Sequence, residues 1–193
     1  MHPRFDGDYL IAQTLLPLVI RALALGEPSA ASPSRDDCAR ALAFTAFDEM
    51  DMLSAMAELT ARPPFLDQLD HAARQAAAER AVRTPFSRDE LSRALATARA
   101  AIAQRPDDWQ LRYIGGRMLL HTGDPAGALE HLAAAVQLMP ANPVIRIELA
   151  NCLTQLHRPA ETAAQLRAAL LLDPENPSAR AGLEALEKTT PAR

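Results

Sequence analysis

Histidines are the side chains most able to carry acid–base or metal chemistry in this chain, which has five of them. His71, His121, His131 and His157 could each serve as a general base or a metal ligand. A helical metal site usually places a second ligand four residues further along, with a carboxylate nearby. None of the four has this arrangement. We therefore predict that they are helix-surface or turn residues.

Two other groups of residues could suggest a metal centre. The segment "DEMDM" (48–52) combines acids with methionines, a pattern typical of a solvated helix face beside core residues. Cys38 and Cys152 are far apart and neither lies in a CxxC spacing, and Cys152 falls in an apolar run that favours a core position. The sequence predicts no metal, no disulfide framework and no cofactor.

The composition indicates helices. Hydrophobic residues make up 49% of the 193 positions, aromatic residues only 4%, and there are seven glycines. Alanine and unbranched side chains favour helices because they lose little rotamer freedom there. The net charge is −4, and no cluster of basic and aromatic residues occurs, which argues against nucleic acid as a partner. We expect an all-α protein.

A period of 34 residues organises the second half of the chain. Pro106, Pro140 and Pro174 recur at this spacing, and "LMPANP" and "LDPENP" repeat around the last two. Asn142 is a good N-cap, and the proline after it suits the first helical position because its missing N–H is not needed there. The earlier proline ends the preceding helix. Each six-letter segment therefore predicts a joint between two helical hairpins.

A 34-residue helix–turn–helix period resembles the tetratricopeptide repeat. Small residues stand where the helices of such a repeat approach closely: Gly116, Ala128, Ala135, Ala150 and Ala169. Gly123 is expected to make the first turn. The sequence departs from the pattern at Gly115, His157 and Thr162. The resemblance implies a right-handed superhelical stack of about 2.5–3 repeats, with a half-repeat at 87–106, repeats at 107–140 and 141–174, and a polar capping helix at 175–190.

Tetratricopeptide arrays usually bind a peptide along the concave face of their first helices. The resemblance places ten residues of this chain on that face: Gln110, Tyr113, Ile114, Arg117, His121, Val144, Ile147, Glu148, Asn151 and Gln155. Their mixture of apolar and polar groups suits an extended or helical protein segment. A clamp for a terminal carboxylate is not expected, because the face offers such a group only Arg117 and Asn151, and Glu148 would repel it. The chain's own N-terminal helix is an alternative occupant.

Residues 1–82 do not follow this period. The stretch 9–25 is apolar but carries Pro17 and Arg21, and it is too short to span a bilayer. The acids before it argue against a signal peptide. We expect a helix buried against another surface, followed over 26–86 by a helical linker region. Its first helix is expected to be short and to begin with a capping box formed by Ser34 and Asp37. Two further helices are expected at 45–61 and 67–82.

The segment "HPRFDGDYLIAQTLLPLV" resembles the last conserved block of SGNH/GDSL-type hydrolases. The matching positions are His2, Phe5, Gly7, Tyr9 and Ala12. The resemblance implies that His2 would be a catalytic base, but the serine and the aspartate of such an enzyme are absent from this sequence. Some bacterial proteins join such a hydrolase to a helical linker and tetratricopeptide repeats. A late start, a truncated relative or a separate enzyme polypeptide would each account for the resemblance.

These observations predict a non-catalytic scaffold that binds a protein or peptide segment, located in the cytoplasm. The first alternative is the C-terminal part of an SGNH hydrolase acting on acyl or polysaccharide esters. A second is an accessory repeat region like that of O-linked N-acetylglucosamine transferases, although no phosphate-binding glycine loop is present. A homodimer formed through the apolar N-terminal helix is a further possibility.

Overall fold

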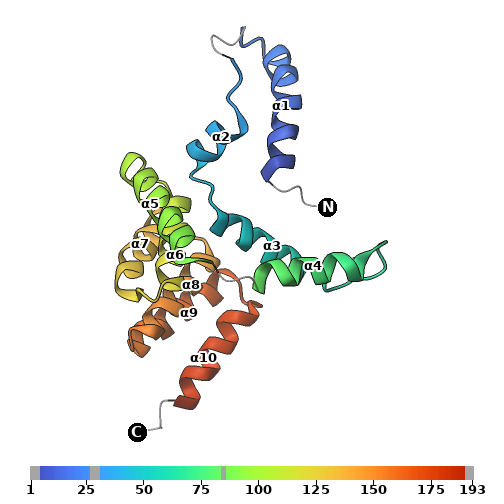
Figure 1. Ribbon diagram of the computed structural model, residues 1–193. Coiled ribbons are helices and arrows are strands. Elements are labelled where there is room, and N and C mark those ends of the chain that lie inside the picture. Colours follow the sequence, from blue (N-terminus) through green and yellow to red (C-terminus); the bar gives the residue numbers. More distant parts are fainter. Residues whose placement is uncertain (1–4, 27–30, 84–85, 190–193) are drawn as a thin grey trace. The chain divides into compact units, whose positions relative to one another are not determined.

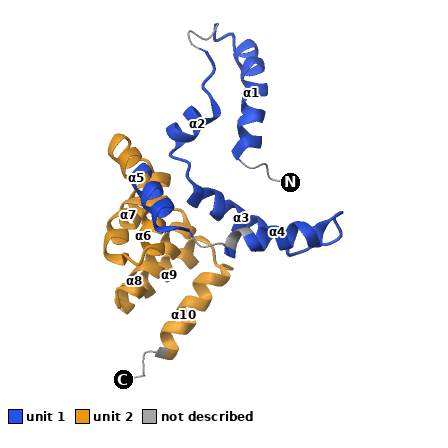
Figure 2. Ribbon diagram, in the orientation of Figure 1, with its two compact units in different colours: residues 1–97 blue, residues 98–193 orange. Residues whose placement is uncertain are grey.

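The computed structural model describes residues 5–26, 31–83 and 86–189. Within these ranges the chain forms ten α-helices and no β-strand, as the composition predicted. Figure 1 shows helices joined by short turns through the second half of the chain. The chain divides into two compact units, residues 1–97 and 98–193, with the division inside one helix (Figure 2).

Four helices and part of a fifth form the first unit. They are α1 (Phe5–Ala22), α2 (Arg35–Leu42), α3 (Ala46–Thr60), α4 (His71–Arg83) and the beginning of α5 (Arg88–Gln104). The second unit contains the end of α5 and a run of helices of similar length. These are α6 (Trp109–His121), α7 (Pro125–Leu138), α8 (Pro143–Gln155), α9 (Pro159–Leu172) and α10 (Pro177–Thr189).

The helix starts in the second unit confirm the predicted joints. The side chain of Asn142 accepts hydrogen bonds from the backbone N–H groups of Val144 at 2.9 Å and Ile145 at 3.4 Å, and Pro143 is the first residue of α8. Asn176 accepts from the N–H of Ala179 in the same way. These bonds satisfy donors that have no partner within the helix. The joints are therefore encoded locally, by a cap and a proline.

Small residues let α6 and α7 pack closely. A Cβ atom added at Gly116 would lie 2.6 Å from Cγ of Leu132, which is fully buried. The turn after α6 uses Gly123 at φ +77°, as expected. The corresponding turn after α8 places His157 at φ +55°, a conformation that is costly for a residue with a Cβ atom. The second hairpin thus keeps the turn geometry without the glycine.

The core of the second unit repeats along the stack. Ala128, Leu132 and Ala135 are buried on α7, and Thr162, Leu166 and Ala169 are buried at the same positions of α9. The hydroxyl of Thr162 is satisfied because it donates to the carbonyl of Arg158 at 3.0 Å. This bond explains how a polar residue replaces the alanine of the first hairpin.

The first unit confirms some expectations and corrects others. Ser34 and Asp37 form the predicted capping box at the start of α2. Helix α3 covers the predicted range, whereas α4 begins four residues later than predicted, after a turn that places Asp70 at φ +57°. Helices α3 and α4 are joined by the side chain of Gln75, whose Nε2 donates to the carbonyl of Ala57 at 3.0 Å.

Helix α1 differs most from its expectation. Its long apolar run predicted burial, yet none of its residues is buried. Its N-terminal end contacts the segment around α2. The rings of Phe5 and Phe44 stack with centroids 4.4 Å apart, and Arg35 Nε lies 2.6 Å from a carboxylate oxygen of Asp6. The rest of the helix carries exposed leucines, isoleucine and valine.

Candidate functional site

The predicted binding face lies on α6 and α8, which are neighbours in the stack. On an ideal helix, the five predicted residues of each helix fall within an arc of about 100°. Those that are exposed are Gln110, His121, Val144, Asn151 and Gln155. Those that are half-buried are Tyr113, Ile114, Arg117, Ile147 and Glu148. We refer to these ten residues as the α6–α8 face.

Three residues at the centre of this face form a contact between the two helices. The guanidinium carbon of Arg117 lies 5.5 Å from the centroid of the Tyr113 ring, within the range of a cation–π interaction. Arg117 Nε lies 3.8 Å from Oε1 of Glu148, and each of these side chains is 23% exposed. The pair is partly shielded from water, so its two charges compensate each other. Sequence reasoning placed these residues on one face but did not foresee the link.

One predicted residue also belongs to the core. Ile147 is partly buried against the cluster of Ala150, Leu166, Ala169 and Ala179. A residue in this position holds α8 to α9 and α10. Its substitution would therefore disturb the fold as well as any binding.

An arginine recurs on α6, α8 and α10, and it supports the joint that precedes each of these helices. Arg112 Nε donates to the carbonyl of Pro106 at 3.0 Å, Arg146 to that of Pro140 at 2.9 and 3.1 Å, and Arg180 to that of Pro174 at 2.8 and 3.1 Å. We refer to these three as the joint arginines. They are spaced by the same 34 residues as the prolines, and this signal was missed in the sequence.

Two of the joint arginines, Arg112 and Arg146, also reach the second helix of their hairpin. Arg146 Nη1 donates to Oε1 of Gln165 at 3.1 Å, and Arg112 Nη1 lies 3.5 Å from Nδ1 of His131. Because arginine only donates, Nδ1 of His131 has to be the unprotonated ring nitrogen in this contact. Burial and the charges of Arg112 and Arg99 lower the pKa of His131, and Glu130 opposes them.

The described ranges contain no cluster of side chains that could hold a metal ion. No three potential ligands of the His, Cys, Asp and Glu types come together there. Burial raises the pKa of the Cys152 thiol, which contacts the carbonyl of Pro125 at 3.2 Å, so this cysteine is not activated as a nucleophile. His2, the basis of the hydrolase resemblance, lies outside the described residues.

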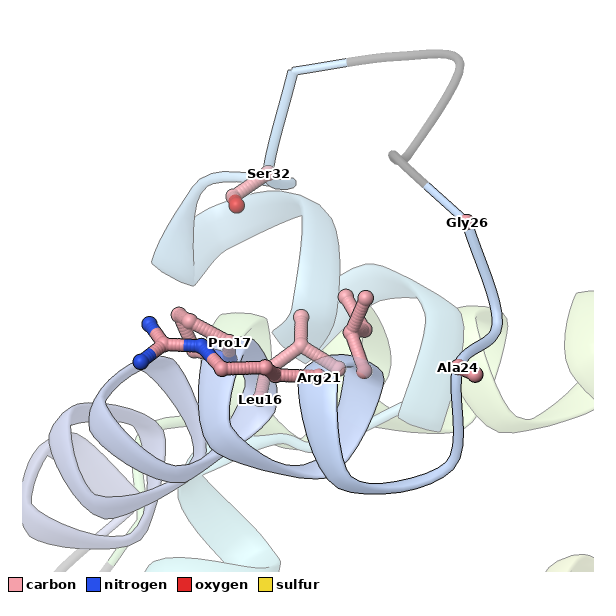
Figure 3. Close-up of a pocket in the computed structure, with 7 residues that line it drawn as sticks. Leu16, Pro17, Arg21, Ala24, Gly26 and Ser32 are labelled. Carbon is pink, nitrogen blue, oxygen red and sulfur yellow. The ribbon is translucent and has the colours of Figure 1, made fainter.

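A pocket of about 490 Å³ lies in the first unit, beside α1. It is lined by Leu16, Pro17, Ile20, Arg21, Ala24, Gly26 and Ser32. Figure 3 shows Leu16, Pro17 and Arg21 on the side of α1 that faces Ser32. Of these lining residues only Arg21 is ionisable, so they offer no acid–base pair. None of the described helices is both long and apolar enough to cross a membrane.

Comparisons with known proteins agree with this architecture. Residues 119–186 match the tetratricopeptide repeat family. A thermophilic tetratricopeptide repeat protein of Thermus thermophilus is 24% identical in sequence, with a TM-score of 0.50 over 76% of this chain and 74% of its own. That likeness shows the fold, a stack of tetratricopeptide-type hairpins.

Two further structures are similar at lower scores. The repeat domain of Arabidopsis OM64 is 14% identical, with a TM-score of 0.49 over 75% of this chain and 98% of its own. The Yersinia enterocolitica type III secretion chaperone SycD, in complex with a peptide of the translocator YopD, is 16% identical, with a TM-score of 0.48 over 74% of this chain and 95% of its own. A search of curated proteins found no match.

Proposed function

We propose that this chain is a non-catalytic module that binds an extended protein segment on the α6–α8 face. The observation that carries the proposal is the arrangement around Tyr113, Arg117 and Glu148. An aromatic ring and a compensated charge pair lie there between neighbouring helices, with exposed amide side chains on either side.

The chemistry of this face suits a peptide backbone. Gln110, Asn151 and Gln155 are exposed, and an amide side chain both donates and accepts hydrogen bonds. It can therefore pair with the N–H and the C=O of an extended chain. Val144, which is 51% exposed, offers an apolar contact for one side chain of that segment.

The charge pair argues against recognition of a terminal carboxylate. Glu148 lies 3.8 Å from the guanidinium of Arg117 and would repel a second carboxylate brought to the same place. The segment should therefore bind through an internal stretch, and neither a free carboxyl terminus nor strong acidity should be required.

A displayed library of random peptides, about 12 residues long, would test the proposal on the 193-residue chain. Selected peptides should bind about fivefold more weakly to Gln110→Ala and to Asn151→Ala, since each change removes a hydrogen bond of about 1 kcal/mol. Gln137→Ala is the matched control, because Gln137 is an exposed amide on α7, outside the face.

Helical content and unfolding midpoint should be unchanged in these three variants, because the replaced side chains are exposed. Selected peptides that bind the face variants as tightly as the control would rule out this face. Failure to select any peptide from the library would count against the proposal as well.

The hydrolase and transferase alternatives are not part of this proposal. Neither the described residues nor the matches above support a hydrolase remnant.

A further inference from the structure

A hydrogen-bond donor and an acceptor lie side by side at the centre of the α6–α8 face. Arg117 Nε and Glu148 Oε1 are 3.8 Å apart, which is longer than the roughly 2.7–3.2 Å of a hydrogen bond. Each of these side chains is 23% exposed, so the pair is accessible from outside the helices. The two charges therefore attract each other across a gap that a small polar group of a ligand can reach.

Both members of the pair have bonding capacity for more than one partner. A guanidinium carries five N–H donors, and a carboxylate offers about four acceptor sites. The ring of Tyr113, whose centroid is 5.5 Å from the guanidinium carbon, contacts the charge of Arg117 without accepting all of these donors. The ring also restrains the guanidinium, so its donors are in place before a ligand binds.

The pair is complementary to a primary amide, the group that Asn and Gln side chains carry. An amide has an acceptor oxygen and two N–H donors on separate atoms of one planar group. Its oxygen can accept from Arg117 while its nitrogen donates to Glu148. Both hydrogen bonds would involve a charged partner, and such bonds are stronger than those between neutral groups.

Other polar side chains match the pair less well. A carboxylate could accept from Arg117 but would be repelled by Glu148, and an ammonium group could donate to Glu148 but would be repelled by Arg117. A hydroxyl would have to bond both groups through a single oxygen atom. The pair therefore favours a neutral group that donates and accepts at different atoms.

The depth of the pair indicates a side chain of the bound segment and not its main chain. Gln110, Asn151 and Gln155 are exposed, whereas Arg117 and Glu148 are half-buried. A segment whose main chain pairs with the exposed amides would reach the half-buried pair through a side chain. Asn151 lies three residues after Glu148 on α8, so the two are neighbours on the helix surface.

We propose that the segment bound on the α6–α8 face directs the amide side chain of an Asn or Gln to Arg117 and Glu148. The amide oxygen accepts from Arg117, and the amide nitrogen donates to Glu148. This contact presupposes the proposed function, and it defines the chemistry of one side chain of the partner.

Peptides selected on the 193-residue chain should share an Asn or Gln at one position. Replacement of this residue by alanine should weaken binding about tenfold, because two hydrogen bonds are lost. Replacement by the acid of the same size, Asp or Glu, should weaken it at least as much, because Glu148 repels the new charge. Isothermal titration calorimetry with synthetic peptides and the unmodified chain would measure both changes.

A substitution in the protein would assign the amide to this pair. Glu148→Gln keeps the size of the side chain and leaves the charge of Arg117 without its opposing acid. The peptide with the acid should then bind as tightly as the amide peptide, or more tightly. Glu130→Gln is the matched control, because Glu130 is an exposed glutamate on α7, outside the face. It should keep the original preference for the amide, and circular dichroism should show equal helix content in both variants.

The possible results distinguish the amide contact from the binding face itself. Selected peptides that bind Asn151→Ala more weakly, but share no Asn or Gln, would leave the face in place and overturn the contact. A preference for the amide that persists in Glu148→Gln would also overturn it, because the amide would then bind elsewhere. Failure to select any peptide, or peptides that bind Gln110→Ala and Asn151→Ala as tightly as the unmodified chain, would overturn the proposed function and the amide contact together.

Discussion

Gly115 and Gly116 are adjacent, buried in α6, and should respond in opposite ways to replacement by alanine. At both positions the higher helix propensity of alanine should by itself raise the free energy of unfolding by about 1 kcal/mol. The difference comes from the atom that the new Cβ would meet.

At Gly115 that atom is the end of a flexible side chain. The added Cβ would lie 2.9 Å from Cδ1 of Ile102, a terminal methyl that can rotate away. The helix gain should therefore outweigh the cost of the contact. We expect Gly115→Ala to leave the free energy of unfolding unchanged or to raise it by up to about 1 kcal/mol.

At Gly116 the new atom would meet a branch point that cannot rotate away. The Cβ would lie 2.6 Å from Cγ and 2.9 Å from Cδ2 of Leu132, and 3.4 Å from the carbonyl oxygen of Ala128. Relief requires α6 and α7 to separate, and overpacking of this kind costs about 1–3 kcal/mol. After the helix gain, Gly116→Ala should lower the free energy of unfolding by up to about 2 kcal/mol.

Urea unfolding followed by circular dichroism would measure both values. Gly182→Ala is a useful third variant, because its Cβ would meet a terminal methyl of Leu166 at 2.9 Å and should behave like Gly115→Ala. If Gly116→Ala proved as stable as Gly115→Ala, the close approach of α6 and α7 would not be the reason for the glycine.

Three further variants test other features of the stack. Arg146→Met removes the bonds to the carbonyl of Pro140 and to Gln165, and should cost about 1–2 kcal/mol in urea unfolding; no loss would mean that water replaces these bonds. His157→Gly should raise the unfolding free energy by about 0.5–1 kcal/mol, because glycine adopts the positive φ without strain; a decrease would contradict this. The lowered pKa of His131 means that the unfolded chain binds a proton more readily, so stability should be full above about pH 6.5 and fall as the pH drops below it. His131→Gln should flatten that dependence in unfolding curves between about pH 5 and 8, and an unchanged slope would assign it to other groups.

The features that sequence analysis predicted best are those that depend on neighbouring residues. Asn142 and Pro143 specify a helix start within a few positions, so their role could be deduced from type and order alone. The joint arginines were missed because each side chain bonds a carbonyl six residues earlier. Helix propensity does not predict a side-chain contact over that distance. Their 34-residue spacing was nevertheless present in the sequence.

Helix α1 illustrates the opposite difficulty. An apolar run predicts that a helix needs a cover, but it does not say which surface provides it. In the structure no residue of α1 is buried. The repeat register was enough to predict which residues share the α6–α8 face. The contact of Arg117 with Glu148 depends on the distance between two helices, and residue spacing along the chain does not give that distance.

Each joint of the stack is complete within a short length of chain. The carbonyl of Pro140, the cap of Asn142 and the guanidinium of Arg146 all lie within seven consecutive positions, and Pro174, Asn176 and Arg180 repeat the arrangement. A hairpin of 34 residues could therefore be duplicated or deleted between two joints without breaking either one. Stability in such arrays is close to a sum over units and their neighbouring interfaces. The length of the array is thus free to change in evolution, or by design, while the manner of joining stays the same.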